Sequence, residues 1–377
     1  MDSEYIKRLE KIEERLSLFL PRFPGRSWMD MVFEDSARQV GRDLAASLLE
    51  PGWDIVNRGG KRWRPLLLTL ICEALGGGDK GLALVPLVEF PHNASLIHDD
   101  IEDNSDERRG RPAVHLIYGA DTAINSGCFL YFLPLVCIDS WDATAELKNR
   151  LYAVWAEHMR RLHLGQAMDI KWHRDFAAVP DPAEYELMCR LKTGSLARLA
   201  AVLGVYAGYA GKAGGLSAGR EIFRERAVLQ IKAFGGAAEK LGVGFQILDD
   251  VKNLTTGNPG KKRGDDVVEG KKSLPALLFL NENPGKAPLV ERCFRAARAG
   301  GSSAPEVEEL IGEFEAAGVL EKAGARGLAL IGEAMEALAN PGGDFWETGN
   351  GGEEGPGLAA EALAARRLLA GFTELLR

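Results

Sequence analysis

The sequence predicts an all-α protein, and three observations lead to this class. The strong helix formers Ala, Leu, Glu, Lys and Arg are abundant, alternating valine and isoleucine patterns are scarce, and most segments between glycines space their apolar residues as helices do. With 377 residues and 46% hydrophobic content, the chain can bury a large core. Its formal net charge of -8 argues against nucleic acid as a general partner.

The N-terminal part of the chain contains two predicted helices and a glycine-rich basic motif. Residues 4–20 form an amphipathic pattern, and residues 28–49 form a second helix that ends before Pro51-Gly52. Glycines 59 and 60 then precede Lys61 and Arg64, which lie one turn apart at a predicted helix start. Because glycine allows close approach to the backbone and a helix start attracts negative charge, this motif is suited to an anion.

An acidic motif carries the strongest chemical signal. Residues 85–97 predict a buried helix, and Asp99 and Asp103 are spaced to project from one face of its end. Magnesium takes oxygen ligands, keeps several waters and is usually completed by substrate phosphates, so the pair predicts half of a phosphate-holding metal site. Arg108 and Arg109 add planar donors suited to phosphate. The alternative is a charged loop whose exposed ion pairs contribute little.

The middle of the chain is expected to be helical with two breaks. A loop is expected at 113–119, and Pro180 and Pro182 should interrupt the helical pattern. Helices are predicted over residues 121–135, 144–176, 184–194 and 196–209.

A second acidic motif repeats the first far along the chain. A helix predicted over 221–250 leads to Asp249 and Asp250, and Asn253 follows one turn later. If the two acidic helices face each other across a bundle, their carboxylates can enclose cations that grip a diphosphate from both sides.

The C-terminal part is expected to complete one large domain. The glycine- and lysine-rich loop 255–270 should be mobile and able to close over a charged substrate. Further amphipathic helices are expected between 289 and 338. The predicted organisation is a domain over 1–340 that includes an N-terminal helical extension at 1–45, followed by a Gly-rich linker at 341–357 and a C-terminal helix at 358–377.

The cysteines and apolar runs predict a soluble, cytoplasmic protein without an integral membrane segment. The apolar runs 66–72 and 128–138 are too short to span a bilayer, and the N-terminus lacks a signal-peptide pattern. The sequence has no C-x-x-C pair, so a zinc site is not expected. Reduced, buried thiols are expected for the five widely spaced cysteines, Cys72, Cys128, Cys137, Cys189 and Cys293.

Seven short motifs occur in order along the chain. They are Gly59-Gly60-Lys61-x-x-Arg64-Pro65, Asp99-Asp100-x-x-Asp103, Arg108-Arg109-Gly110, Gly165-Gln166, Lys192-Thr193-Gly194, Phe245-Gln246-x-x-Asp249-Asp250 and Gly270-Lys271. In this order the chain resembles the trans-isoprenyl diphosphate synthases, also called polyprenyl synthetases, from about Leu48 to about Leu280. Within that family it looks most like the eukaryotic-type geranylgeranyl diphosphate synthases. The resemblance implies the isoprenoid synthase fold, a large antiparallel helical bundle around a central cleft.

The resemblance also implies an activity and a set of roles. The enzyme would join isopentenyl diphosphate head to tail with an allylic diphosphate, as a homodimer that uses Mg²⁺, with three ions when substrate is bound. Ionisation of the allylic diphosphate would give a carbocation that the isopentenyl double bond attacks. The implied ligands are Asp99, Asp103 and Asp249 for magnesium, with Asp100 and Asp250 in support; Lys61, Arg64, His92 and Arg109 for isopentenyl diphosphate; Arg108, Lys192, Gln246 and Lys271 for the allylic diphosphate; and Thr193 with Gln246 for the cation.

The resemblance further suggests which residues limit product length. The small residues Ala94 and Ser95, one turn before Asp99, would leave the upper part of the pocket open. Tyr131, Phe132 and His163 match the positions that close the pocket in geranylgeranyl synthases, although they could merely pack the core. A C20 product is therefore expected, with a longer polyprenyl diphosphate as the alternative.

Two other functions stay open at this stage. A class I terpene cyclase shares the fold and the first acidic motif, but Asp249-Asp250 and the Lys61 and Arg64 pair speak against it. A non-catalytic subunit of a hetero-oligomeric synthase would often lose acidic residues that are intact in this chain.

Overall fold

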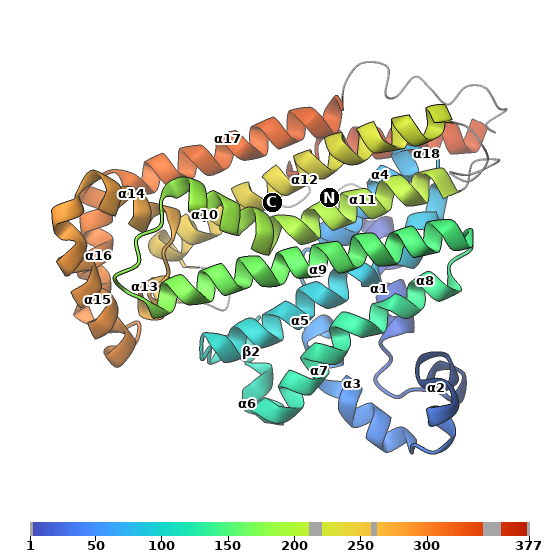
Figure 1. Ribbon diagram of the computed structural model, residues 1–377, viewed down its shortest axis with the longest axis horizontal. Coiled ribbons are helices and arrows are strands. Elements are labelled where there is room, and N and C mark those ends of the chain that lie inside the picture. The colour runs from blue at the N-terminus through green and yellow to red at the C-terminus, as the bar shows by residue number, and fades with distance from the viewer. Residues whose placement is uncertain (1–2, 211–220, 258–261, 342–355, 375–377) are drawn as a thin grey trace.

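The computed structural model describes residues 3–210, 221–257, 262–341 and 356–374, and these ranges are mostly helical (Figure 1). The described strands are two residues long: β1 (Glu107–Arg108) pairs antiparallel with β2 (Arg111–Pro112). The all-α prediction is therefore confirmed.

A bundle of long helices forms the main core. Helix α11 (Ser195–Ala210) is buried along almost its whole length because α4 (Trp63–Ala74) and α12 (Glu221–Thr255) pack against it. Helices α5 (Pro86–Glu102), α7 (Ala120–Phe132) and α9 (Ala145–Arg174) lie beside them (Figure 1). Apolar residues cover more than one face of α4 and α11, which is typical of helices in the centre of a bundle.

A smaller group of helices has its own apolar core. It contains α13 (Asp265–Glu269), α14 (Leu274–Glu282), α15 (Ala287–Gly300) and α16 (Pro305–Ala316). Phe279, Phe294 and Phe314 are fully buried in it. This group forms the left end of the molecule in Figure 1, and α17 (Val319–Ala339) runs back from it along α12.

Shorter elements surround the bundle. In chain order they are α1 (Ser3–Phe19), α2 (Arg26–Phe33), η1 (Glu34–Arg38), α3 (Arg42–Asn57), η2 (Gly78–Leu84), α6 (Val114–Tyr118), η3 (Leu133–Leu135), α8 (Val136–Ser140), α10 (Pro182–Cys189), η4 (Arg190–Gly194), η5 (Pro284–Lys286) and α18 (Pro356–Ala370).

The helix predicted over 28–49 is wrong in its bounds. The chain forms α2 and η1 and then starts α3, which continues through Pro51 and Gly52 to Asn57. The tertiary contact with α7 explains why the Pro-Gly pair does not end the helix. Gly52 N donates to Ser126 Oγ at 3.2 Å, and a Cβ at Gly52 would lie 2.9 Å from Leu130 Cδ1. The close packing of these two helices therefore compensates for the break in the local pattern.

Other predictions about the fold meet mixed outcomes. The segment 113–119 is not a loop, because it holds the short helix α6. Part of the loop 255–270 lies outside the described residues, and the described part contains α13. The predicted Gly-rich linker falls almost entirely outside them. All five cysteines are described and free, and Cys128 is exposed rather than buried, since it lies on the outer face of α7.

One described stretch is long and apolar enough to cross a bilayer by length and composition alone. It covers Ala120–Ser140, and half of its most apolar window is buried inside the bundle. The apolar run 128–138, from which no membrane segment was predicted, begins within α7 and leaves out residues 120–127. A core helix of a bundle has the same composition, so this criterion is weak evidence for a membrane segment.

Candidate active site

A cleft of about 490 Å³ opens between the main bundle and the smaller group of helices. The sequence-predicted residues that line it come from segments far apart in the chain. They are Lys61, Arg64, His92, Ser95, Asp99, Asp103, Arg108, Arg109, Lys192, Thr193, Gln246, Asp249, Asp250 and Lys271. The fold thus brings both acidic motifs and the basic residues predicted around them to one place.

The acidic end of α5 forms one part of the lining. Asp99 lies on the last turn of the helix, and Asp103 is the residue that ends it. Gln166 of α9 donates through Nε2 to Asp99 Oδ1 at 2.5 Å and to Glu102 Oε2 at 2.6 Å. Lys192 Nζ lies 3.8 Å from Asp99 Oδ1. The Asp99 carboxylate is therefore oriented by neighbours while part of it remains accessible, with 18% of the side chain exposed.

The acidic end of α12 combines an exposed carboxylate, Asp249, with a buried one, Asp250. Burial raises the pKa of Asp249, although Lys252, Lys61 and Arg64 act in the opposite direction. Burial and the neighbouring Asp266 raise the pKa of Asp250 to about 7. Two hydrogen bonds oppose that rise, one from Tyr185 Oη to Asp250 Oδ2 at 2.6 Å and one from Gln246 Nε2 to Asp250 Oδ1 at 2.9 Å.

The residue that ends the second motif has a structural partner. Asn253 is buried, and its Oδ1 accepts a hydrogen bond from the backbone N of Asp266 at 3.1 Å. This bond holds the start of α13 against α12. The side-chain oxygen of Asn253 thus serves a contact between two helices.

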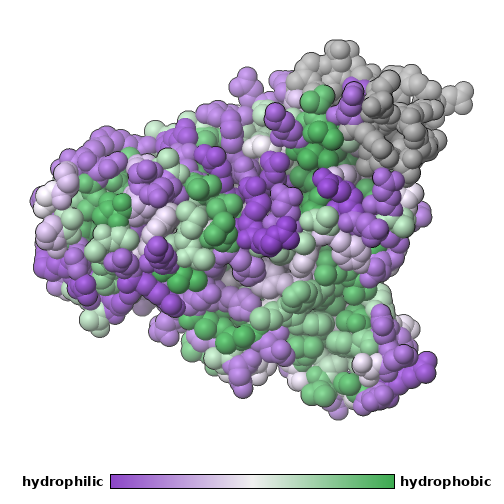
Figure 2. Space-filling model, viewed as in Figure 1, coloured by the Kyte–Doolittle hydropathy of each residue, from purple (hydrophilic) through white to green (hydrophobic). Residues whose placement is uncertain are grey.

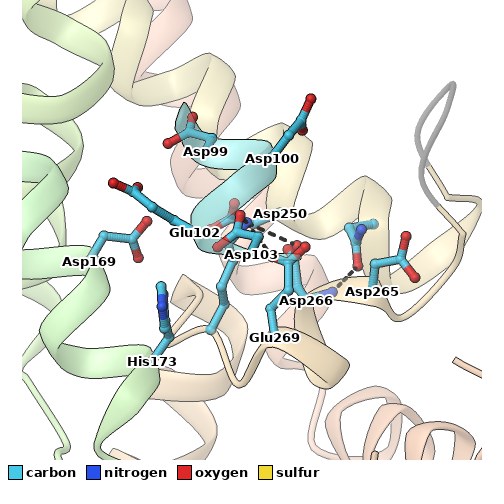
Figure 3. Close-up of polar contacts among 12 residues, drawn as sticks. Asp99, Asp100, Glu102, Asp103, Asp169, His173, Asp250, Asp265, Asp266 and Glu269 are labelled. Carbon is cyan, nitrogen blue, oxygen red and sulfur yellow. Dashed lines mark hydrogen bonds and ion pairs between the residues drawn. The ribbon is translucent and has the colours of Figure 1, made fainter. Parts of the chain in front are cut away.

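Three acidic groups, two from α13 and one from the end of α5, meet around Lys271. Its Nζ lies 2.6 Å from Glu269 Oε2, 3.6 Å from Asp266 Oδ1 and 3.8 Å from Asp103 Oδ2. Figure 3 shows Asp103 of α5 beside Asp250 of α12 and Asp266 of α13. Burial would lower the pKa of Lys271, but the surrounding carboxylates raise it well above its ordinary value. Lys271 is therefore a charged ammonium that links the end of α5 to α13.

The adjacent lysine has the opposite surroundings. Lys272 is buried, and its Nζ lies 4.7 Å from the ring centroid of Phe294 and 5.6 Å from that of Phe176. Its Nζ has no hydrogen-bond partner in the described part of the chain. Burial lowers its pKa to about 8. Since Lys272 also lines the cleft, it is a residue of the site that the sequence motifs did not identify.

A cationic group lies at one end of the cleft. Arg64 packs over the ring of Trp63 at 4.5 Å, and its buried Nε has no hydrogen-bond partner among the described residues. Burial is the largest factor that lowers the pKa of Arg64 and of Arg109 to about 10, and it also lowers the pKa of His92 well below its ordinary value. Neighbouring arginines add to the lowering in each case. Such a group is stabilised when an anion enters.

A second cationic position is built by an irregular helical turn. The π-helical turn η4 contains Lys192 and Thr193, and π turns are frequent at functional sites. Lys192 Nζ lies 2.6 Å from Asp169 Oδ2, and Thr193 Oγ1 donates to Gln246 Oε1 at 2.8 Å. Burial would lower the pKa of Lys192, but Asp169 and Asp99 raise it above its ordinary value. Gly165 allows α9 to reach this turn, because a Cβ there would lie 2.3 Å from the backbone N of Lys192.

Five predicted residues do not line the cleft. Asp100 is fully buried and accepts from Arg108 Nε at 2.9 Å, so its place in support of magnesium is corrected to anchoring that arginine. Ala94 is buried behind Ser95. Tyr131 is buried with its ring 5.8 Å from His98. His163 is exposed, with its ring 5.1 Å from Tyr131.

Phe132 requires the clearest correction. The sequence predicts that it closes the pocket floor, but 64% of its surface is exposed and its ring faces Trp155 at 6.5 Å. Successive residues on a helix differ in direction by about 100°. Because Tyr131 of α7 points into the bundle, Phe132 points out of it.

The acidic residues fit a magnesium site that substrate completes. In the described ranges, no group of three His, Cys, Asp or Glu side chains is close enough to hold an ion by itself. Asp99, Asp103 and Asp249 nevertheless offer hard oxygen donors on one cleft. Magnesium is usually bound by one or two carboxylates with waters and substrate phosphates, so this donor set fits the ion once a diphosphate is present.

Comparisons with known proteins agree on one family. The family model described as polyprenyl synthetase matches residues 45–311. A geranylfarnesyl diphosphate synthase of Aeropyrum pernix is 33% identical over 246 residues, which are 63% of this chain and 71% of the relative. A geranylgeranyl pyrophosphate synthase of Neocamarosporium betae is 36% identical over 240 residues, which are 63% of this chain and 62% of the relative.

The structural comparison agrees with the fold. The crystal structure of a geranylgeranyl pyrophosphate synthetase from Pyrococcus horikoshii superimposes with a TM-score of 0.72 and 24% sequence identity. The match covers 98% of this chain and 97% of that one. At this identity the likeness establishes the arrangement of the helices.

Proposed function

The chain belongs to the polyprenyl synthetase family, and we propose that it condenses isopentenyl diphosphate head to tail with an allylic diphosphate to give geranylgeranyl diphosphate. The observation that carries this proposal is the convergence of two acidic helix ends and two separate cationic groups on one cleft. An enzyme that joins two diphosphates needs two anion sites, and it needs metal-holding carboxylates at only one of them. A longer polyprenyl diphosphate is the second candidate product.

The acidic ends of α5 and α12 would act on the allylic diphosphate. Asp99 and Asp103 on α5 and Asp249 on α12 would hold the magnesium ions, and three ions are proposed when substrate is bound. When bound, these ions supply positive charge that stabilises the diphosphate as it leaves. Lys192 and Lys271 would add charge-assisted hydrogen bonds to the same group, since each is a half-buried ammonium close to the acidic residues.

The cationic group at the other end would bind isopentenyl diphosphate. Arg64 and Arg109 offer guanidinium donors, and Lys61 and His92 line the same part of the cleft. Since these groups weaken one another's protonation, an incoming diphosphate relieves their mutual repulsion. The binding would place the isopentenyl double bond near the carbon from which the allylic diphosphate departs.

Two neutral groups would stabilise the positive charge that develops between the two sites. Thr193 donates its hydroxyl proton to Gln246, and Gln246 donates to Asp250. This orientation leaves oxygen lone pairs rather than protons on Thr193 to face the cleft. Oxygen dipoles directed at an allylic cation lower its energy.

We also propose that two copies of the chain pair through the outer face of α6 and α7. Leu116, Ile117, Ile124 and Phe132 are exposed there, and the hydrophobic area in the lower part of Figure 2 lies over α7. A clustered apolar surface of this kind is typical of an interface. The free cysteines support a reducing, cytoplasmic compartment.

A product assay tests the reaction. The protein is incubated with radiolabelled isopentenyl diphosphate, magnesium and each allylic diphosphate from C5 to C15, and the dephosphorylated products are separated by chromatography. Labelled C20 alcohol is expected. Cyclic hydrocarbon formed without isopentenyl diphosphate would indicate a terpene cyclase, and the absence of any product would favour a non-catalytic subunit.

The same assay tests the chain-length residues. Ala94→Phe is expected to shorten the product, because the new ring would enter the pocket one turn below the acidic residues. Tyr131→Ala and His163→Ala are expected to lengthen it. Phe132→Ala is the comparison variant and should leave the length unchanged, since its exposed ring points out of the bundle. Chains of C30 or more from the wild type would contradict the proposed product.

A further inference from the structure

Arg62 lies within the basic motif and at the edge of the cleft, but its guanidinium is engaged by other groups of the protein. It has a left-handed backbone, with φ 47° and ψ 28°, and it is 4% exposed. Its Nε donates to Glu13 Oε1 at 2.7 Å, and its Nη1 donates to Glu89 Oε1 at 2.8 Å. Its Nη2 donates to Val56 O at 2.5 Å. The guanidinium is therefore fully used in joining α1, the end of α3 and α5.

The contacts continue from Glu89 towards the cleft. Asn93 lies one turn further along α5 and is 0% exposed. Its Nδ2 donates to Glu89 O at 2.8 Å and to Glu89 Oε1 at 3.1 Å. Both partners only accept hydrogen bonds, so the orientation of the Asn93 amide is fixed and its Oδ1 must face the other way.

The amide oxygen of Asn93 holds Arg109. Arg109 Nη1 donates to Asn93 Oδ1 at 3.1 Å and to Ile55 O at 3.0 Å. Its Nη2 is directed towards the glycine-rich turn, because a Cβ at Gly60 would lie 3.2 Å from that atom. Arg109 itself has a positive φ of 55°. Both the backbone and the head of this arginine are thus held in a particular geometry.

We propose that Glu13 and Asn93 are positioning residues for the isopentenyl diphosphate site, acting through the hydrogen-bonded chain Glu13, Arg62, Glu89, Asn93 and Arg109. The inference rests on the proposed function, which assigns Arg109 to that substrate. Charges alternate along this series of hydrogen bonds up to the neutral amide of Asn93. Its three middle residues, Arg62, Glu89 and Asn93, are almost completely buried. Through these hydrogen bonds α1 affects substrate affinity, although none of its residues lines the cleft.

The positioning role has a physical reason. Arg109 lies among other cations, and without an anion these repel one another. A guanidinium held only by its own flexible side chain would move away from Arg64. Two acceptors on Nη1 keep it in place before substrate binds, so less conformational freedom is lost when the diphosphate arrives.

The test uses calorimetric titration of isopentenyl diphosphate into the full chain, together with steady-state kinetics. Asn93→Leu keeps the side-chain volume but removes the acceptor, and it is expected to weaken isopentenyl diphosphate binding about tenfold. The KM for the allylic substrate should stay within twofold. Glu13→Ala should weaken the binding about threefold and Glu13→Gln less, since the amide oxygen can still accept from Arg62. Glu14→Ala, exposed on the same helix, is the matched control and should change nothing.

The outcomes separate this inference from the proposed reaction. Wild-type binding of isopentenyl diphosphate without turnover would contradict the reaction, and weaker binding by Asn93→Leu would still support the inference. Equal binding by the wild type, Asn93→Leu and Glu13→Ala would overturn the inference even if turnover is normal. A parallel loss of affinity for both substrates would also overturn it, because it would indicate a general structural effect. A wild type that does not bind isopentenyl diphosphate would overturn both.

Discussion

The acidic ends of α5 and α12 follow the same sequence pattern but differ in their surroundings. Asp99 is partly exposed and held by Gln166 and Lys192. On α12, burial raises the pKa of Asp249, and burial with Asp266 raises that of Asp250 to about 7. Two helices that each present an Asp-Asp pair therefore place their carboxylates in different surroundings. The neighbouring elements set this difference, and the motif alone does not.

The largest effect is expected when one carboxylate is removed from the acidic end of α5 or of α12. Asp99→Ala and Asp249→Ala should each lower turnover by about a thousandfold, because both act on the diphosphate as it leaves. Both variants should remain folded, because the Asp249 side chain is exposed and that of Asp99 is only partly buried.

Turnover and thermal unfolding of both variants check this prediction. Asp142→Ala, on an exposed loop, is a control that should keep normal activity. If either cleft variant retained the wild-type rate at saturating magnesium, the assignment of that aspartate as a magnesium ligand would be wrong.

A smaller effect should separate the two substrates. Arg64→Ala is expected to raise the KM for isopentenyl diphosphate by roughly 10- to 100-fold, with little change for the allylic substrate, because it removes a charge-assisted contact from one site only. Lys192→Ala should do the reverse. Initial rates with each substrate varied in turn would measure both constants. Similar increases in both constants would mean that the sites overlap or have been exchanged.

The smallest expected effect concerns pH and tests the contrast directly. The hydrogen bond from Tyr185 lowers the pKa of Asp250, so Tyr185→Phe should raise that pKa further. Asp250 would then stay protonated to higher pH, and activity would be lost sooner as pH falls. The acid limb of the kcat/KM profile should move up by about one pH unit at subsaturating magnesium. Rates well above pH 8 should match the wild type, and an unchanged acid limb would show that Asp250 does not limit the reaction.

Local patterns predicted the long helices and the two acidic pairs well. The helices predicted over 144–176 and 196–209 agree with α9 and α11 to within a few residues, because apolar spacing and proline breaks are local signals. The expected end at Pro51-Gly52 was wrong, because the contact of Gly52 with Ser126 and Leu130 depends on a helix more than 70 residues away.

The surroundings of the site residues could not be predicted in the same way. Tyr185 contacts Asp250 across 65 positions, and nothing in its own segment marks it as a partner of a carboxylate. The contact of Asn253 with the start of α13 likewise depends on the packing of two helices. The direction of Phe132 also depends on the rotation of α7 in the bundle. Motifs therefore indicate which residues gather in the cleft, whereas the packing determines their charge and orientation.

The π turn at Arg190–Gly194 has a consequence for insertions and deletions in this chain. It lies between α10 and α11, which it joins without a break, and it takes up one residue more than an α-helical turn would. Because the five residues of this turn wind through about the angle that four residues cover in an α-helix, deleting one of them would restore regular winding and leave the two flanks in nearly the same relative orientation. A deletion within α10 or α11 would instead rotate Tyr185 by about 100° relative to the core face of α11. The π turn is thus the place in this stretch where the chain can lose a residue without turning Tyr185 away from Asp250.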